Sequence, residues 1–324
     1  MGKTLISICI PTYNRAAYLK RCLESVIGYQ GDDIEIVIRN NHSPDNTAEV
    51  VRKFNDKRIK YYENESKNNM GANFIDVIKD ATSKYVYILT DDDYLLPGAI
   101  DDLKRFINDH IPIAFYTERI AYLIKKKKIY PLSVFPETRL PHTMSFKESA
   151  KVIQYAHVWT SLCFEKDKVD FGFMDKYGRN NICPNIILYG LFAYKIAYMA
   201  VPTAVHIDEN ELYWDIMPSR WDLISKEIFS ALSLLKGVCD EQLIIELAKR
   251  YYDMFGVEYH ELLNLLPRTE REEFMREKRR NNNRKYIIKH YQRFELFFKK
   301  IARRLLDRVF YANGDLPNNH GARK

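Results

Sequence analysis

Tyr85-Val86-Tyr87-Ile88-Leu89-Thr90-Asp91-Asp92-Asp93-Tyr94-Leu95-Leu96-Pro97-Gly98 is the stretch of the chain that decides the fold. Its first part, up to Leu89, is β-branched, aromatic or otherwise apolar, which predicts a buried strand of a parallel sheet. The strand ends in three consecutive carboxylates, and Pro97 and Gly98 turn the chain into a helix that starts near Ala99. Ligand sites of parallel α/β sheets lie at the carboxyl ends of strands, so the carboxylates stand where a site is expected.

Two interpretations of the three carboxylates are open from this stretch alone. Adjacent acids repel one another, and a bound cation is the simplest way to relieve that repulsion. A solvated acidic turn is the alternative, because Asp is a common turn residue. The segments upstream decide between the two.

Strands and helices alternate over the first hundred residues. Strands are expected at 5–10, 34–38 and 59–62, and helices at 17–27, around 50–54 and from 71 onward. This alternation predicts βαβ units and a parallel sheet.

Four polar motifs stand in order along these units: Ser7 to Arg15, Asn41 to Thr47, Asn69-Met70-Gly71, and Thr90 to Asp93. In order and spacing they resemble the family 2 glycosyltransferases with the GT-A fold, closely over residues 4–100 and more loosely over 101–210. The resemblance implies an α/β fold with a doubly wound, mainly parallel nucleotide-binding sheet flanked by helices. It also implies transfer of a sugar from a nucleoside diphosphate sugar, with inversion, to a hydroxyl of a surface-glycan or lipid-linked acceptor.

The resemblance assigns most of the donor site to these motifs. A carboxylate-held Mn²⁺ or Mg²⁺ would stabilise the charge that develops on the leaving diphosphate, and a glycine at a helix entrance would let backbone N–H groups approach the phosphates. For Gly71, a purely structural role at the helix start is the alternative, and for His206, a surface histidine. The nucleotide-sugar set is Pro11, Thr12, Tyr13, Asn14, Asn40, Gly71, Asp91 and Asp92, and the metal set is Asp93, Asp91 and His206.

Asn40 departs from the family pattern, which has an Asp that accepts a hydrogen bond from uracil at this position. An amide both donates and accepts, so Asn40 is compatible with uracil, thymine or cytosine. Uracil, and hence a UDP sugar, is favoured on family grounds, and CDP and TDP sugars stay open. The alternative is that Asn40 only caps its turn.

The catalytic base also departs from the pattern. The family places it in a Glu-Asp pair at a helix start, and Pro184-Asn185 stands there instead. Neither residue removes a proton from a hydroxyl. The nearest upstream carboxylate, Asp175, is the first substitute and Asp208 the second, while a catalytically degenerate nucleotide-sugar-binding module is the alternative function.

The rest of the first 212 residues is expected to form the acceptor half, 101–212, of a glycosyltransferase domain whose nucleotide half is 1–100. Strands are predicted at 113–116 and 120–124, with a turn at Lys125 to Lys128. Trp159 is interpreted as a core residue, with stacking on a sugar as the alternative.

A mostly helical extension, 213–312, and a disordered tail, 313–324, complete the predicted organisation. Residues 286–310 form a basic amphipathic pattern that suits an anionic membrane surface, the protein's own core, or a second subunit. Between residues 268 and 308 there are 15 Lys and Arg against 6 Asp and Glu, a local charge of +9 that leaves −2 for the rest. The segment has no recognised nucleic-acid motif, so nucleic acid is not the expected partner.

Composition places the chain among folded proteins of a reducing compartment. It has 324 residues, 46% of them hydrophobic, and no run of about 18 apolar residues that would span a membrane. Five scattered cysteines without CxxC spacing predict core thiols, with neither a disulfide framework nor a zinc site. No leader segment is evident, so the expected location is the cytoplasm, with peripheral contact at the inner face of the plasma membrane as an option.

Overall fold

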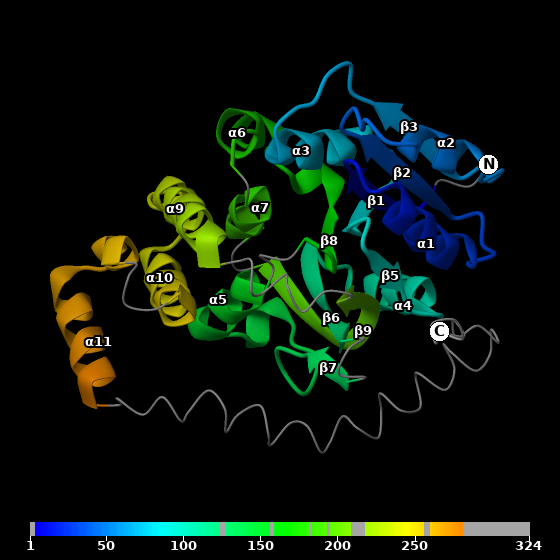
Figure 1. Ribbon diagram of the computed structural model, residues 1–324. Coiled ribbons are helices and arrows are strands. Elements are labelled where there is room, and N and C mark those ends of the chain that lie inside the picture. The colour runs from blue at the N-terminus through cyan, green and yellow to red at the C-terminus, as the bar shows by residue number, and fades with distance from the viewer. Residues whose placement is uncertain are drawn as a thin grey trace, which may run out of the picture.

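The computed structural model describes residues 4–123, 128–155, 159–181, 183–192, 195–208, 218–255 and 260–280. Within these ranges nine strands form one sheet in the order β3-β2-β1-β4-β8-β6-β9-β5, with β7 paired to β6 (Figure 1). The strands are β1 (Ile6–Thr12), β2 (Ile34–Asn40), β3 (Ile59–Glu63), β4 (Tyr85–Ile88), β5 (Asp93–Leu95), β6 (Ala114–Leu123), β7 (Lys128–Leu132), β8 (Leu162–Glu165) and β9 (Ile196–Asp208).

Helices pack on both faces of this sheet (Figure 1). The helices longer than one turn are α1 (Ala16–Ile27), α2 (Thr47–Arg52), α3 (Met70–Asp80), α4 (Ala99–His110), α5 (Phe146–Tyr155), α7 (Pro184–Phe192), α9 (Pro218–Leu235), α10 (Glu241–Phe255) and α11 (Arg268–Arg280). Shorter turns are α6 (Phe171–Phe173), a π-helical segment at Met174–Gly178 and a 3₁₀ segment at His260–Leu265.

The amino-terminal half of the sheet has the predicted parallel arrangement. Strand β1 pairs in parallel with β2 and with β4, and β2 pairs in parallel with β3. Alternate residues of β1 point to opposite faces: Ile8 lies in the core cluster that includes Leu23 of α1, and Cys9 in the cluster that includes Phe74 of α3. The carboxyl ends of β1, β2 and β4 therefore meet at one edge of the sheet.

The second half of the sheet adds antiparallel strands to the parallel nucleotide half. Strand β8 is antiparallel to both of its neighbours, β4 and β6, so the whole sheet is mixed. The two strands expected at 113–116 and 120–124 are one continuous strand, β6, which runs parallel to β9 with register shifts around Glu118. The expected lysine turn lies largely outside the described residues, and Lys128 already begins β7.

Strand β5 was not predicted. It contains only the last carboxylate of the triplet and the two residues after it, and it pairs antiparallel with β9. This pairing sets Asp93 opposite His206, although the two residues are 113 positions apart in the chain.

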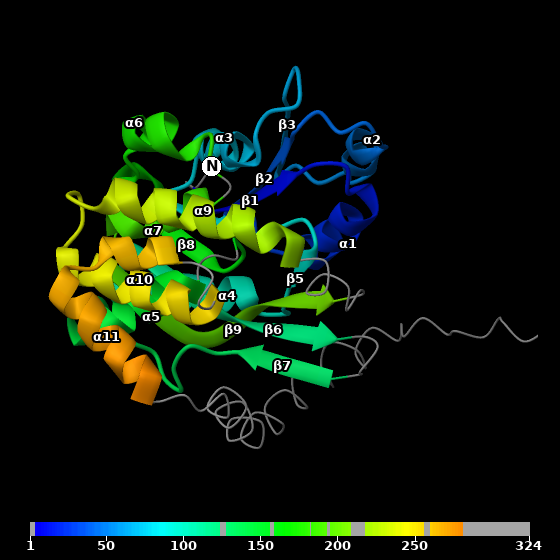
Figure 2. The same ribbon diagram turned by 60° about the vertical axis from the view of Figure 1, so that its left-hand side comes forward.

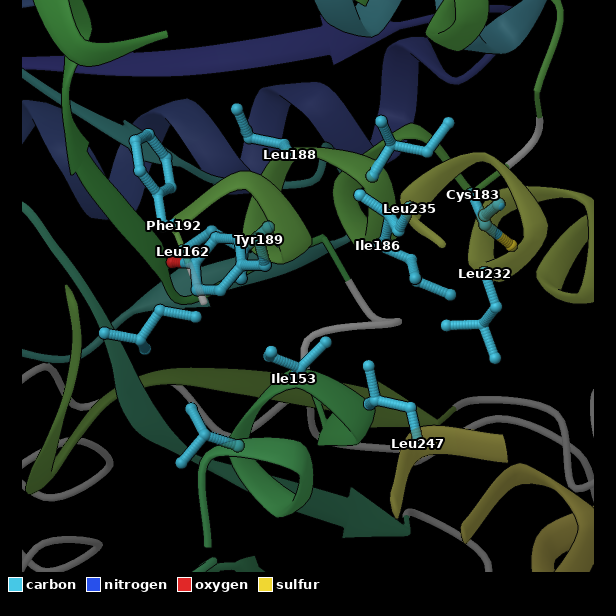
Figure 3. Close-up of a cluster of buried hydrophobic side chains, with 14 of the residues drawn as sticks. Ile153, Leu162, Cys183, Ile186, Leu188, Tyr189, Phe192, Leu232, Leu235 and Leu247 are labelled. Atoms are coloured by element: carbon cyan, nitrogen blue, oxygen red, sulfur yellow. The ribbon is translucent and has the colours of Figure 1, made fainter. Parts of the chain in front are cut away.

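The carboxyl-terminal helices pack on the same core as the sheet. Leu232 and Leu235 of α9 and Leu247 of α10 lie in one cluster with Ile153 of α5 and Ile186 of α7 (Figure 3). Figure 2 shows α9, α10 and α11 stacked beside α5 and α7, away from α1 and α2. The boundary expected at 212/213, the helix expected at 286–310 and the tail lie outside the described residues. No helix in the described ranges is long and apolar enough to cross a membrane.

Candidate active site

The predicted motifs gather at the edge where the parallel strands end. Thr12 ends β1, Asn40 ends β2, and the three carboxylates follow β4. Strand β9 brings His206 to the same place through its pairing with β5. The site is built from segments that the topology brings together.

Asp91 faces the end of β1. Thr12 Oγ1 donates a hydrogen bond of 2.7 Å to Asp91 Oδ2, and both side chains are buried. Burial raises the pKa of Asp91 to about 7, and the neighbouring charge of Asp92 adds to the rise.

Asp92 is the most accessible acid of the triplet, with 26% of its side chain exposed. Its Oδ2 accepts a 2.5 Å hydrogen bond from Arg15 Nη1, which also lies 3.6 Å from Asp91 Oδ1. Arg15 stands in the Pro-Thr-Tyr-Asn-Arg motif, but the sequence analysis gave it no role. Its guanidinium supplies part of the counter-charge that a bound cation alone was expected to supply.

Asp93 is the buried acid of the triplet, with 1% of its side chain exposed. Its Oδ1 lies 2.7 Å from His206 Nδ1, and its Oδ2 lies 3.4 Å from Arg119 Nη1. Burial alone would raise the pKa of Asp93, but the hydrogen bond with His206 and the charge of Arg119 outweigh it and lower that pKa. Burial opposes the charged form of His206, yet the bond to Asp93 raises the pKa of the imidazole.

The donor atoms of this cluster fit a divalent cation. Asp92, Asp93 and His206 each offer one ligand atom, and these atoms lie within 4.8 Å of one another. Carboxylate oxygens with an imidazole nitrogen suit Mn²⁺, and carboxylates suit Mg²⁺. The expected metal set contained Asp91; here Asp92 joins Asp93 and His206, while Asp91 turns to Thr12.

Arg119 is a functional-site residue that the sequence analysis missed. Only 4% of its side chain is exposed, and it reaches Asp93 from β6. The available signal was the pair of charged residues Glu118 and Arg119 between two apolar runs, because a buried charge requires a partner. The split prediction of β6 obscured it.

Hydroxyl groups hold the strand end beneath the triplet. Thr160 Oγ1 accepts a 3.0 Å hydrogen bond from the Thr90 backbone N–H and lies 2.7 Å from Thr90 Oγ1. The next residue, Ser161, is fully buried with a φ of 79°, which is a strained conformation for a residue other than glycine.

Trp159 packs against Phe74, with ring centroids 4.7 Å apart, so it has the expected contact with the core.

The side chain of Asn40 is engaged within the protein. Its Oδ1 accepts hydrogen bonds from the backbone N–H and the hydroxyl of Ser43, at 3.1 and 2.5 Å. Its Nδ2 donates to the Tyr61 hydroxyl at 2.9 Å, and only 1% of the residue is exposed. These bonds correspond to the turn-capping alternative. They also tie Asn40 to Asn14, whose backbone N–H donates to Ser43 Oγ.

Gly71 has a packing role at the start of α3. A Cβ atom there would lie 2.2 Å from the carbonyl oxygen of Asn181 and 2.5 Å from that of Gly178. Only glycine allows the backbone of residues 178–181 to approach so closely. The structural alternative for Gly71 therefore has a direct physical cause.

Asp175 is held by two cations away from the triplet. Lys79 Nζ lies 2.6 and 2.7 Å from its two oxygens, and Arg179 Nη1 lies 3.2 Å from Oδ1. Lys79 is near the carboxyl end of α3, which leads into the start of β4, whereas the triplet follows the other end of β4. The bond from Lys79 lowers the pKa of Asp175. The structure thus argues against Asp175 as the catalytic base.

The other positions considered for the base give a mixed result. Pro184 begins α7 and Asn185 is fully buried, so the helix start carries no carboxylate. Asp208 ends β9, two residues beyond His206, and its side chain is outside the part of the chain that the structure describes. Asp208 therefore stays a prediction.

The nucleoside-side residues line the first strand end. Pro11 is buried in β1. The ammonium group of Lys67 lies 4.2 Å from the ring centroid of Tyr13. Asn14 has a φ of 55°, which turns the chain between β1 and α1. The contacts of these residues with a donor remain predictions.

Known proteins resemble this chain in sequence and in fold. Residues 7–167 match the model of glycosyl transferase family 2. Among relatives, a GalNAc(5)-diNAcBac-PP-undecaprenol beta-1,3-glucosyltransferase of Campylobacter jejuni is 33% identical over 107 residues, 32% of this chain and 35% of that protein. A hyaluronan synthase of Pasteurella multocida is 37% identical over 118 residues, 35% of this chain and 12% of that protein.

A solved structure extends the likeness in fold beyond these matches. Residues 1–349 of S. aureus TarS, in complex with UDP-GlcNAc, superpose with a TM-score of 0.62 at 16% identity, covering 81% of this chain and 80% of that one. This likeness shows the GT-A fold. The sequence matches span about a third or less of the relatives' own lengths.

Proposed function

Because this chain belongs to glycosyl transferase family 2, we propose that it transfers a sugar from a nucleoside diphosphate sugar to a hydroxyl of a glycan or lipid-linked acceptor. The observation that carries the proposal is the convergence at one sheet edge. Thr12, the carboxylates that follow β4 and His206 come from three separate segments and meet there.

The residues at this edge of the sheet would each bind a different part of the donor. Thr12 fixes Asp91 on the side of the nucleoside, where Asp91 would accept hydrogen bonds from the ribose or meet the phosphates. Asp92, Asp93 and His206 would hold Mn²⁺ or Mg²⁺, which would supply positive charge for the leaving diphosphate. Arg15 would give up its bond to Asp92 when the donor enters.

A UDP sugar is the favoured donor, with CDP and TDP sugars as alternatives. Support comes from the fold shared with TarS, which was solved with UDP-GlcNAc. Because Asn40 Oδ1 already accepts two hydrogen bonds, the amide would offer its remaining N–H, and oxygen atoms of any pyrimidine accept such a bond. Asn40 alone would therefore not distinguish one pyrimidine from another, and the identity of the nucleobase would be selected by the turn that Asn14, Asn40 and Ser43 form together.

Inversion by direct displacement requires a base for the acceptor hydroxyl. Asp208 is the candidate that we retain, because it ends β9 beyond His206.

A lipid-linked acceptor is supported by the name of the Campylobacter jejuni relative, which includes an undecaprenol-linked glycan.

Calorimetric titration with UDP, CDP, TDP and GDP, each with Mn²⁺ or with EDTA, tests the proposal. We expect one pyrimidine diphosphate to bind, and to bind more tightly with Mn²⁺. Absence of binding by all four under both conditions would contradict it.

A second candidate function is a nucleotide-sugar-binding module without transfer. It is favoured by the Pro184-Asn185 pair at the start of α7, where the family has its acids, and by the ion pairs of Asp175. A measurement of nucleoside diphosphate released from the bound donor distinguishes the transferase from the binding module. Binding without release, across donors and glycan acceptors, would support the module.

A peripheral contact with anionic membrane through residues 286–310 is also part of the proposal. Its support is the basic and apolar pattern of that segment. Cosedimentation with vesicles containing anionic lipid, compared with neutral vesicles, tests it: binding to neither would contradict it.

A further inference from the structure

We propose that Lys151 of α5 and Arg250 of α10 together bind a phosphate group. Both side chains are partly buried, and both carry a positive charge. Neither helix carries a residue that we assign to the donor site, so the proposal goes beyond sugar transfer and does not depend on that site.

The two cations lie on the same seam between α5 and α10. Gln154 Nε2 donates a 3.2 Å hydrogen bond to the backbone oxygen of Arg250, and Gln154 Oε1 lies 3.4 Å from Arg250 Nη1. Lys151 and Gln154 are three positions apart in α5, so their side chains share one face of that helix. The contact with Gln154 therefore brings the guanidinium to the face of α5 that carries the ammonium group.

The partners of Lys151 carry no full negative charge. Its Nζ donates a 2.5 Å hydrogen bond to the backbone oxygen of Val134 and lies 4.7 Å from the ring centroid of Phe135. An ammonium group has three N–H donors, so this single hydrogen bond leaves donors for a ligand. Within the described residues, Lys151 has no carboxylate partner.

Arg250 is also without a carboxylate partner among the residues that the structure describes. Its Nη1 reaches the side-chain amide of Gln154, and its Nε is buried with no hydrogen-bond partner in the described ranges. Buried donors in proteins are normally paired, and a guanidinium has five of them. Arg250 therefore keeps donors that this part of the chain does not use.

The acidic side chains near the two cations are engaged elsewhere. Glu148 Oε2 accepts a backbone N–H and a hydroxyl at the start of α5, each at 2.9 Å. Glu246 Oε1 lies 3.7 Å from Lys249 Nζ, and Asp253 Oδ1 lies 2.6 Å from Lys278 Nζ. The seam between α5 and α10 thus keeps positive charge that these acids do not neutralise directly.

The electrostatics of the pair agree with this geometry. Burial lowers the pKa of Lys151, and the charge of Arg250 lowers it further, against the opposite effect of Glu148. Burial also lowers the pKa of Arg250, against the effect of Glu246. An anion bound between the two cations would relieve their repulsion and stabilise both charged forms.

A phosphate group suits this pair of donors. Its oxygens accept two parallel hydrogen bonds from a guanidinium, while a lysine supplies a compact positive charge. Arg139 adds to the positive potential, since its Cζ lies 5.9 Å from the centroid of the Phe135 ring that Lys151 also faces. Arg139 itself is paired with Glu137, at 2.9 Å, so Lys151 and Arg250 are the residues to test.

Calorimetric titration with inorganic phosphate, in EDTA and at constant ionic strength, tests the proposal. We expect Lys151→Gln and Arg250→Gln each to weaken phosphate binding about 10-fold or more, because each removes a charged hydrogen-bond donor. Lys147→Gln is the matched control, because Lys147 is an exposed lysine of the same helix, and it should bind phosphate as the wild type does. No binding by the wild type, or equal affinity in the wild type and both test variants, would overturn the proposal.

Nuclear magnetic resonance gives a second readout that does not depend on a substitution at the site. The titration midpoint of the Lys151 side chain, followed through its ¹³Cε signal, should move to higher pH when phosphate is added. The Lys147 signal is the control and should stay within about 0.2 pH units. An unchanged midpoint for Lys151 at saturating phosphate would contradict the proposal.

Two further titrations identify the source of the phosphate group and separate this site from the donor site. Tighter binding of geranyl pyrophosphate than of inorganic pyrophosphate, in the wild type but not in Arg250→Gln, would assign the site to a lipid-linked phosphate, and equal binding to a free one. Loss of nucleoside diphosphate binding in Arg250→Gln would contradict a site independent of the donor. If phosphate binds through Lys151 and Arg250 but no nucleoside diphosphate binds, the inference stands and the proposed donor site is wrong.

Discussion

Arg119 and Asp93 form a buried ion pair between β6 and β5, with 3.4 Å between Nη1 and Oδ2 and at most 4% of either side chain exposed. Strand β5 is only three residues long, and its pairing with β9 is its link to the sheet. The ion pair therefore helps to fix the acid triplet on a short strand.

Removing the charge of Arg119 should destabilise the protein strongly. We expect Arg119→Met to lower the free energy of unfolding by about 3–5 kcal/mol, because Asp93 would keep a buried charge with one partner fewer. Urea denaturation followed by circular dichroism measures this. The matched control is Arg105→Met, which breaks an exposed pair with Asp102 and should cost about 0.5 kcal/mol or less. Equal effects of the two substitutions would contradict the assignment.

A methyl group at Gly71 should disturb the packing of α3. We expect Gly71→Ala to lower the free energy of unfolding by about 1–3 kcal/mol, because backbone carbonyl oxygens of residues 178 and 181 would have to move. Gly28→Ala is the control, since a Cβ there meets its nearest atoms at ordinary distances of 3.7 and 3.8 Å. If Gly71→Ala kept full stability and lost only donor affinity, the phosphate-contact role would be favoured instead.

The pH dependence of stability should reveal Asp91. Its folded-state pKa of about 7 lies above the usual value of a carboxyl group, so its contribution is complete in acid and is lost as the pH rises through 7. In EDTA, Asp91→Asn should gain stability relative to wild type by about 2–3 kcal/mol between pH 5 and pH 8. Thermal unfolding at the two pH values measures the gain. The exposed Asp109→Asn is the control, and a gain as large in that variant would contradict the assignment.

The two carboxylates considered as the base should behave differently. We expect Asp208→Asn to lower kcat by about 10²–10⁴-fold with donor affinity unchanged, as loss of a general base does. Asp175→Asn should leave kcat within about threefold, because its ion pairs with Lys79 and Arg179 lie away from the triplet. Nucleotide release under saturating donor and acceptor measures both. A larger loss of kcat in Asp175→Asn than in Asp208→Asn would instead favour Asp175 as the general base.

The sequence predicted those features that depend on local pattern. The apolar run before the triplet and the polar strand ends of the first hundred residues were enough to predict strands β1 to β4. They also predicted that Thr12, Asp91 and Asp93 lie at the same edge of the sheet. His206 was placed near the acids through the family resemblance, and its pairing with Asp93 agrees with that position.

Other features depended on contacts that a local pattern does not contain. Strand β5 has three residues and no period, so only its pairing with β9 defines it. The polar run Thr117 to Arg119 divided β6 into two apparent strands in the sequence and so concealed Arg119, whereas in the structure β6 continues through register shifts at this point. Likewise, one ion-pair partner of Asp175, Lys79, lies in α3, 96 residues earlier.

A cation-dependent donor site at the carboxylates after β4 is the central claim, and nucleotide affinity tests it most directly. Calorimetry would measure the affinity of the bound nucleoside diphosphate in Mn²⁺ for the wild-type protein and for Asp92→Asn, with Asp175→Asn as the control. We predict about a 100-fold loss for Asp92→Asn, which is about 2.7 kcal/mol, and no change for Asp175→Asn. Unchanged affinity in Asp92→Asn would contradict the claim.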